Sequence, residues 1–199
     1  MGAVAAARSA GDAFTSVVDD PSVNYRRGII MDKKSFLGSF LIIVNDLRRI
    51  TEFIEPVDVN LYVYSHRLHE LLLRICTDFE SICKEKLIED GYTKKPDQMN
   101  IYDYKTLEKS LVLEKVEVGL LFWRPDIVYV QPFKDWSSAN PPLIWYSDYN
   151  KVKHNRNTDF SKANLNNVRL AFAGLFALLA KLDFLSWVSP LFRERSCRL

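Results

Sequence analysis

The segment Phe36-Leu-Gly-Ser-Phe-Leu-Ile-Ile-Val-Asn-Asp-Leu-Arg-Arg-Ile-Thr-Glu-Phe-Ile54 decides the fold class of this chain. Its apolar residues recur at the three- and four-residue spacing of one helix face, while Arg48 and Arg49 fall on the other side. The apolar positions are Phe36, Phe40, Ile43, Val44, Leu47, Ile50, Phe53 and Ile54. Pro56 follows, as is typical just beyond a helix end. We therefore predict an amphipathic helix from Phe36 to Ile54.

A second apolar stripe predicts a longer helix directly downstream. Its members are Leu61, Leu68, Leu72, Ile75, Phe79, Ile82 and Leu87. We expect Asn60 to cap this helix, which runs to about Asp90, and Gly91 to end it at the first residue past the cap. Because only a few residues join the two helices, we expect them to form an antiparallel hairpin.

The middle of the chain changes character. The polar segment Tyr92–Met99 holds a proline and predicts a loop, and Ile101–Leu111 predicts a short helix. Val116–Phe122 and Ile127–Val130 are rich in β-branched residues on either side of the turn Arg124-Pro125-Asp126, which predicts an inserted β-hairpin.

Helical patterns return in the last third. We predict a helix over Leu143–His154, a break at Asn155–Thr158, and a final helix to about Leu185 with Asp159 or Ser161 as its cap. The predicted fold class is mainly α: a bundle of antiparallel helices with a small inserted β-hairpin.

Composition indicates one packed domain. The chain has 199 residues, of which 48% are hydrophobic, and a formal net charge of +2, too balanced to indicate nucleic-acid binding by itself. We expect residues 1–28 to be a flexible tail and 29–199 to be a single helical domain. The uninterrupted apolar run Leu170–Ala180 has eleven residues, against about twenty for a membrane span, so we expect no membrane association.

Three cysteines, at 76, 83 and 197, match neither a disulfide framework nor a metal-binding pattern. Cys76 and Cys83 lie seven residues apart in an apolar stripe, so both are expected on the buried face of one helix. This usage favours the reducing cytoplasm.

The candidate site lies in Trp145-Tyr-Ser-Asp-Tyr-Asn-Lys-Val-Lys-His-Asn-Arg156. On a helix, Asn150, Lys151 and His154 share one face. An imidazole beside an amide and a cation suits contact with a phosphate or a ribose hydroxyl. The alternative is that His154 only closes the helix, while Lys153 and Arg156 are solvated near its negative end.

Other features favour structural roles. His66 and His69 lack further ligands, so we predict an exposed helix flank and no metal. Glu80 and Lys84 suit a surface pair, and Arg67 and Arg74 would line a cationic groove if they faced the helix of His154. Six aromatic residues suit packing more than base stacking: Trp123, Tyr129, Phe133, Trp136, Trp145 and Tyr146. Without a glycine-rich phosphate loop, we expect no cofactor.

The segment Tyr149-Asn-Lys-Val-Lys-His154 on a late helix resembles the HEPN (higher eukaryotes and prokaryotes nucleotide-binding) superfamily. The resemblance extends to Tyr64–Glu80, Ile101–Tyr104 and Asn164–Leu179. It implies a helical bundle that dimerises and, in catalytic members, cleaves RNA without metal through an Arg and a His, in toxin–antitoxin and phage-defence systems.

Carried onto this chain, the resemblance assigns catalysis to His154 and Asn150, which match an Asn-x-x-x-His pattern. It leaves Lys151, Lys153, Arg156 and Tyr149 as candidate nucleic-acid contacts. Tyr149 occupies the position of the family's arginine, which favours a second hypothesis: a non-catalytic interaction module or accessory subunit with a partner protein. The first hypothesis is a homodimeric protein that binds RNA or a nucleotide, with metal-independent ribonuclease activity.

Overall fold

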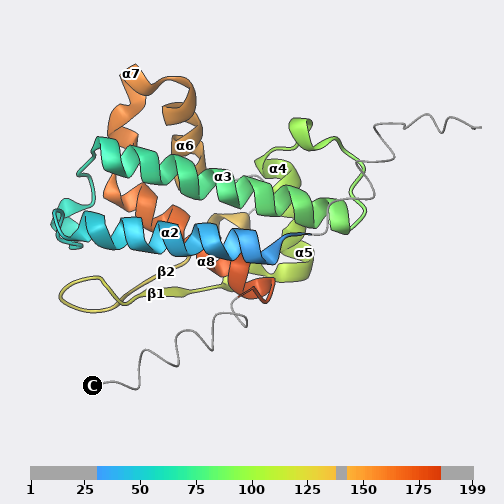
Figure 1. Cartoon of the computed structure of the whole chain (residues 1–199), viewed down its shortest axis with the longest axis horizontal. Helices are drawn as coiled ribbons and strands as arrows, with labels where there is room; N and C mark the ends of the chain where they lie inside the picture. Colours follow the sequence, from blue (N-terminus) through green and yellow to red (C-terminus); the bar gives the residue numbers. More distant parts are fainter. Residues whose placement is uncertain (1–30, 138–142, 185–199) are drawn as a thin grey trace, which may run out of the picture. The chain divides into compact units, whose positions relative to one another are not determined.

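The computed structural model describes residues 31–137 and 143–184 (Figure 1). The predicted tail, residues 1–28, lies outside the described residues. Within them the chain is mainly α-helical with one two-stranded antiparallel sheet, which confirms the predicted fold class. A single hydrophobic core runs through the described part, from Met31 to Phe184.

The first described helix, α2, spans Lys33–Thr51. Asp32 caps it by accepting a hydrogen bond from the backbone N–H of Ser35 at 3.1 Å. The buried residues of α2 follow the predicted spacing: Phe40, Ile43, Leu47 and Ile50. The expectation that Phe53 extends this stripe is wrong, because the helix ends two residues earlier and 87% of the Phe53 surface is exposed.

The long helix α3 spans His66–Glu89 and is capped by Ser65, whose hydroxyl accepts from the N–H of Leu68. The prediction that Asn60 caps it is wrong. Asn60 lies in a short 3-10 turn, Asp58–Asn60, and its side chain donates to the Glu55 carbonyl at 2.9 Å. At the other end Gly91 has φ +81°, the conformation of a helix-terminating glycine.

Cys76 and Cys83 lie fully buried on α3, as predicted. Burial raises the pKa of both thiols well above the ordinary value. Neither thiol is therefore a nucleophile in the folded protein.

The predicted short helix is a near-continuous helical segment made of α4 (Ile101–Tyr104), a 3-10 turn (Lys105–Leu107) and α5 (Glu108–Leu111). The hairpin is also confirmed. Strand β1 (Val118–Leu120) pairs antiparallel with β2 (Val128–Val130).

Three helices complete the described chain: α6 (Ile144–His154), α7 (Arg156–Asp159) and α8 (Leu165–Lys181). Helix α6 ends at His154 as predicted, but the predicted break at Asn155–Thr158 is too long, because α7 begins at Arg156 and only Asn155 separates the two helices. The predicted caps of α8 are wrong: Asn164 caps it by accepting from the N–H of Asn167 at 3.0 Å. Leu185, the expected end of this helix, lies outside the described residues.

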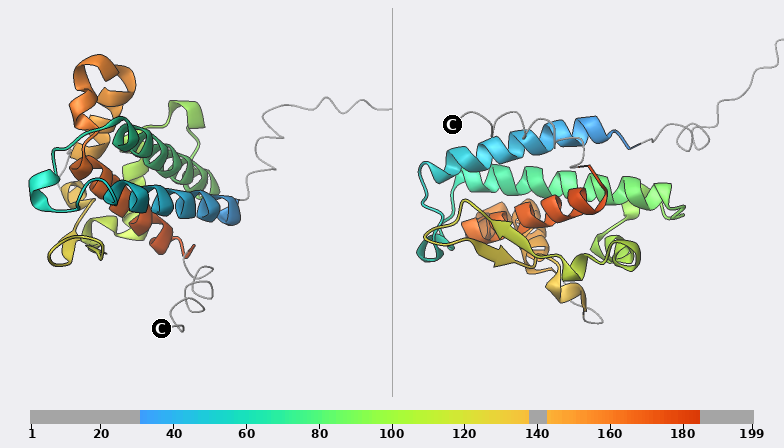
Figure 2. Two further views of the ribbon diagram at one scale, coloured as in Figure 1. Left: turned by 60° about the vertical axis from the view of Figure 1, so that its left-hand side comes forward. Right: turned by 90° about the horizontal axis from the view of Figure 1, so that it is seen from below.

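Helix α8 packs against the antiparallel pair α2 and α3, on the side that carries the β-hairpin (Figure 2). Phe40 of α2 stacks on Phe172 of α8 with ring centroids 5.7 Å apart. Helix α6 packs on both α3 and α8, and Trp145 meets Phe79 edge-on at 5.4 Å. This packing fixes α6, which carries the candidate site.

Five of the six aromatic residues assigned to packing are buried, and only Tyr129 is exposed. None of the helices in residues 31–137 and 143–184 combines the length and apolar character needed to cross a lipid bilayer.

Candidate nucleic-acid interface

Helix α6 presents two different faces. Its buried residues, Trp145, Tyr146, Tyr149 and Val152, repeat at helical spacing and anchor it to the core. The opposite face carries Lys151 and His154, which are exposed, and Asn150, which is half-buried, whereas the exposed Lys153 follows Tyr149 by one turn at the edge of the buried face. The packing of one face thus leaves the candidate residues on the surface.

His154 is the last residue of α6, and its side chain is exposed. It makes no hydrogen bond or ion pair with any described residue, and no hydrogen bond joins it to Asn150. The amide therefore does not orient the imidazole directly. The ring is therefore open to a ligand, and its exposed position at the helix end also agrees with the alternative interpretation, in which His154 only closes the helix.

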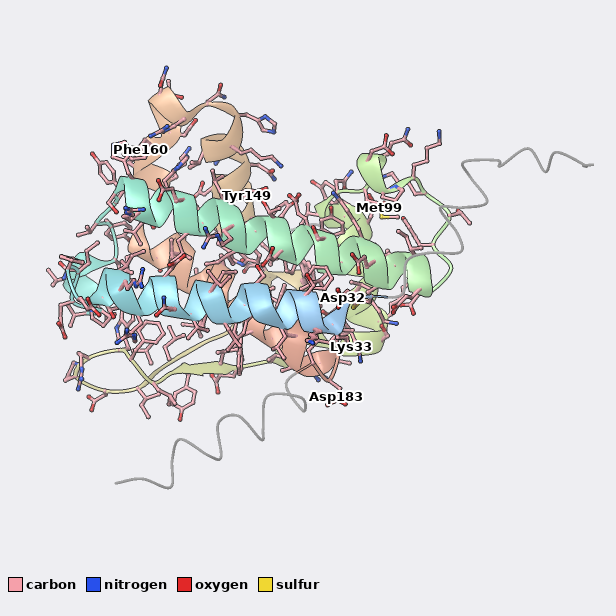
Figure 3. All side chains as sticks on the ribbon, in the orientation of Figure 1. Asp32, Lys33, Met99, Tyr149, Phe160 and Asp183 are labelled. Carbon is pink, nitrogen blue, oxygen red and sulfur yellow. The ribbon has the colours of Figure 1, made fainter. Side chains whose placement is uncertain are left out.

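Tyr149 lies on the inner side of α6, where the helix passes α3 (Figure 3), and only 1% of its surface is exposed. Its hydroxyl accepts a hydrogen bond from Lys153 Nζ at 3.1 Å, and that ammonium also lies 5.1 Å from the Tyr149 ring centroid. Burial raises the pKa of Tyr149, so the phenol stays protonated. Tyr149 can therefore affect a binding surface only indirectly, by positioning Lys153.

Glu80 of α3 completes this contact. Tyr146 donates its hydroxyl hydrogen to Glu80 Oε1 at 2.7 Å, and Lys153 Nζ lies 3.9 Å from Glu80 Oε2. The predicted surface pair of Glu80 with Lys84 is wrong, because the carboxylate turns to α6. The hydrogen bond to Tyr149 and the nearby Glu80 raise the pKa of Lys153, which keeps the ammonium charged.

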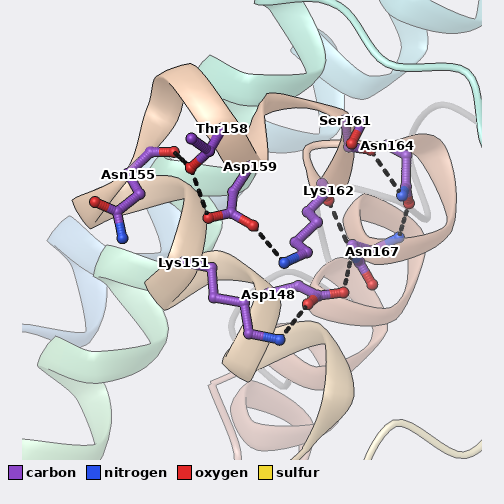
Figure 4. Close-up of polar contacts among 9 residues, drawn as sticks. All are labelled: Asp148, Lys151, Asn155, Thr158, Asp159, Ser161, Lys162, Asn164 and Asn167. Carbon is purple, nitrogen blue, oxygen red and sulfur yellow. Dashed lines mark hydrogen bonds and ion pairs between the residues drawn. The ribbon is translucent and has the colours of Figure 1, made fainter.

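Lys151 takes part in a second polar network, which joins the end of α6 to the start of α8 (Figure 4). Its Nζ lies 3.3 Å from Asp148 Oδ1, and the other oxygen of Asp148 accepts from Asn167 Nδ2 at 3.0 Å. Asn167 is 2% exposed and also donates to the Lys162 carbonyl at 2.8 Å. Lys162 in turn pairs with Asp159. The network fixes α7 and the turn after it.

Arg156, the first residue of α7, reaches the start of α3. Its Nη2 lies 2.8 Å from Nδ1 of His66. A guanidinium can only donate, so His66 Nδ1 must accept, which makes the ring neutral with its proton on Nε2. The Phe160 ring, near the start of α3 in Figure 3, supports the contact: its centroid lies 5.4 Å from the Arg156 guanidinium and 5.0 Å from the His66 ring.

These contacts divide the cations near the candidate site into two kinds. The ammonium groups of Lys151, Lys153 and Lys162 each lie within 4 Å of a carboxylate. Arg156 has a neutral imidazole as its hydrogen-bond partner, and no carboxylate of residues 31–137 or 143–184 forms an ion pair with it. We call the set His154, Arg156 and His66 the α6–α7 surface.

His66 was not predicted as part of this site, because 90 residues separate it from Arg156 and no sequence signal joins them. The neighbouring His69 is nearly buried, with its ring 5.7 Å from that of Phe160. Burial, and secondly Arg156, lower the pKa of His69. Over residues 31–137 and 143–184, no cluster of three or more His, Cys, Asp or Glu side chains is placed to hold a metal ion.

The sequence placed Arg67 and Arg74 in a cationic groove only if they faced α6. In the structure they lie instead along a groove between α2 and α3. There Arg67 pairs with Glu70 at 3.0 Å, and Arg74 pairs with Asp46 of α2. Both arginines are thus separate from the α6–α7 surface.

Comparison of the chain with models of known protein families, with curated proteins and with solved structures finds no match. The functional argument therefore depends on the contacts described above.

Proposed function

We propose that the α6–α7 surface binds the phosphodiester backbone of RNA, or a nucleotide as the smallest ligand of the same chemistry. The observation that carries this proposal is the contact between Arg156 and His66 at 2.8 Å. Arg156 is anchored there by a neutral ring, so its positive charge is available to an anion. Its guanidinium has five N–H donors, and those not used by His66 can bind two phosphate oxygens together.

His154 is the residue that we assign to proton transfer if the bound RNA is cleaved. In metal-free cleavage a base takes the proton of the 2′-hydroxyl, the 2′ oxygen bonds to phosphorus, and the P–O5′ bond breaks. The departing 5′ oxygen then takes a proton from an acid. An exposed imidazole can serve as base or acid near neutral pH, and Arg156 would stabilise the charge that develops on the phosphate.

Asn150 lies one turn before His154 on the same helix. Because no hydrogen bond joins the two side chains, we assign Asn150 to contact with the ligand rather than to orientation of the imidazole. Lys151 and Lys153 contribute a secondary positive potential, since each already lies near a carboxylate.

We further propose that the chain works as a cytoplasmic homodimer in phage defence or a toxin–antitoxin pair, as the HEPN resemblance implies. In a two-fold dimer the same surface of each protomer can lie at the interface, which would bring two copies of His154 and Arg156 together. Sedimentation velocity of the full chain measures the mass directly, and a monomer at all concentrations would contradict this part.

The binding test uses a fluorescent single-stranded RNA of about twelve nucleotides, within the usual site size for single-strand binders. Arg156→Ala should weaken binding about tenfold and reduce the slope of log K against log salt by about 0.7, the loss of one phosphate contact. Arg124→Ala, at an exposed arginine of the hairpin loop, is the matched control. An equal effect of both substitutions would mean that binding is diffuse and not centred on the α6–α7 surface.

Cleavage is tested with the same RNA and its 2′-deoxy analogue, in the presence of EDTA. The wild-type protein should cut only the RNA, and His154→Ala should still bind the RNA but leave it intact. Activity that persists in His154→Ala would remove this imidazole from the mechanism, and wild-type protein that binds without cutting would leave a binding function alone.

The second candidate function is a non-catalytic interaction module. It is favoured by Tyr149, since the residue in the position of the family's arginine is buried and serves to hold Lys153. In this case neither RNA nor a nucleotide binds, and the function lies on another surface. The groove between α2 and α3 is the described surface that best fits such a role.

A further inference from the structure

A groove of about 790 Å³ lies along the exposed edges of α2 and α3, where the two helices run side by side (Figure 1). Apolar side chains from both helices and from the turn after α2 line it: Ile42, Ile50, Phe53, Ile54 and Leu71. Phe53 is 87% exposed and Ile42 is 56% exposed. Single exposed apolar residues are ordinary, but here two large ones border one concave surface.

The helical period shows that this surface is a second stripe on α2. Ile42, Asp46 and Arg49 each precede a core residue by one position, so they lie about 100° around the helix from the core stripe. Phe53 continues the same spacing past the helix end. Helix α2 thus packs one stripe into the core and presents a neighbouring stripe outward.

Within the part of the chain that the structure describes, one arginine of the groove has no charged partner. Arg67 pairs with Glu70 at 3.0 Å, and Arg74 pairs with Asp46. Arg49 is exposed and makes no hydrogen bond or ion pair with the described residues. The groove therefore combines an apolar floor with one uncompensated positive charge.

We propose that this groove binds an amphipathic helix of another protein, with apolar side chains against Ile42 and Phe53 and a carboxylate against Arg49. From position 42 to position 53 the surface is about 16 Å long, which matches about three turns of a bound helix. Helix-in-groove recognition of this kind uses apolar anchors at spacings of three, four and seven residues.

Two other occupants fit less well. RNA is disfavoured because the groove floor is apolar and two of its three arginines, Arg67 and Arg74, are already paired with Glu70 and Asp46. A second copy of the chain related by a two-fold axis through the groove would place groove against groove, and two concave surfaces cannot fill each other. A convex element with a negative charge fits the groove best.

The test uses a phage-displayed library of helical peptides about fifteen residues long, with one face randomised, selected against the full-length chain. The wild-type protein should enrich peptides that carry apolar residues at three-, four- and seven-residue spacing and one Asp or Glu. Arg49→Glu should change that acidic preference to Lys or Arg. Phe53→Ser should weaken the selected peptides about tenfold or more, as expected for an aromatic anchor.

The control substitutions change side chains that are similarly exposed but lie outside the groove. Arg48 is next in sequence and pairs with Glu52 at 3.8 Å outside the groove, so Arg48→Glu should keep the acidic preference. Leu121 of the hairpin turn is 79% exposed, and Leu121→Ser should keep the affinity. All four substitutions affect exposed side chains, so folding is preserved.

Three results would overturn the proposal. The first is a preference for acidic peptides that Arg49→Glu leaves unchanged, and the second is equal enrichment of peptides by the wild type and Phe53→Ser. The third is self-association of the wild type in sedimentation velocity that Phe53→Ser abolishes, which would make a second copy the occupant. Neither His154 nor Arg156 lines this groove, so the proposal stands or falls separately from RNA binding.

Discussion

Arg156 Nη2 and His66 Nδ1 lie 2.8 Å apart and join α7 to the first residue of α3. The contact links two helix ends that are far apart in the sequence. It also holds Arg156, whose charge no carboxylate in the described part of the chain offsets. The geometry of that surface therefore depends on which ring nitrogen of His66 carries the proton.

We expect the ring proton of His66 to lie on Nε2, since Arg156 can only donate to Nδ1. Long-range proton–nitrogen correlation spectra distinguish the two tautomers. Arg156→Ala should give the mixture found in a free imidazole, whereas Arg156→Lys, which keeps one donor, should retain part of the preference. A wild-type spectrum with the proton on Nδ1 would contradict the contact.

Two glycines in helices should respond oppositely to alanine. At Gly174 of α8 an added Cβ would lie 3.1 Å from Trp145 Cζ2, a buried ring that cannot withdraw. Overpacking of this kind costs about 1–3 kcal/mol, which exceeds the helix-propensity gain of about 1 kcal/mol, so Gly174→Ala should lower the free energy of unfolding. Gly38 of α2 is exposed with nothing within 4 Å, so Gly38→Ala should raise it by up to about 1 kcal/mol. Urea unfolding measures both free energies. If both variants were more stable than the wild type, the side chains around Trp145 would have shifted to accept the added methyl group.

Asn167→Ala should loosen the candidate site. The substitution removes the donor that binds Asp148 at 3.0 Å and the Lys162 carbonyl at 2.8 Å, and the loss of a buried partner costs about 1–3 kcal/mol. Hydrogen exchange should accelerate in residues 156–162 more than in α3. Ser161→Ala, at an exposed neighbouring residue, should leave exchange unchanged. Uniform acceleration across the chain would mean that Asn167 supports global rather than local stability.

His69 should make stability fall in mild acid. Its pKa is lowered in the folded chain, chiefly by burial, from the value of 6.5 expected when the ring is exposed. As the pH falls through that range, the unfolded chain binds a proton that the folded chain does not, so the free energy of unfolding decreases until the folded form also titrates. Between about pH 8 and about pH 5.5 the wild type should lose more stability than His69→Gln. Arg156→Ala should lessen the loss, because Arg156 is the second cause of the lowered pKa. Equal losses in the wild type and His69→Gln would contradict this account.

The periodic parts of the fold could be predicted from the sequence. The stripe of Phe40, Ile43 and Leu47 predicts both α2 and its buried face, because a helix that buries one side must repeat its apolar residues at that spacing. The helix ends were less predictable. Asn60 and Ser65 are both common capping residues five positions apart, and the choice between them depends on the chain path after Pro56.

The contacts that shape the candidate site could not be predicted in the same way. The i, i+4 spacing of Glu80 and Lys84 suggested a local pair, but Glu80 binds Tyr146, 66 residues away. Local spacing is visible in one sequence, whereas a contact across helices depends on how those helices pack. The position of His154 at the end of a helix was predicted, and the anchoring of Arg156 on His66 was not.

The two buried thiols of α3 give the protein a built-in reporter of opening. Cys76 and Cys83 are fully enclosed two turns apart, and their raised pKa keeps them in the unreactive protonated form. An alkylating reagent can therefore modify these positions only when α3 separates from its neighbours. The labelling rate at each, read by mass spectrometry, would give the frequency of that separation without an added probe.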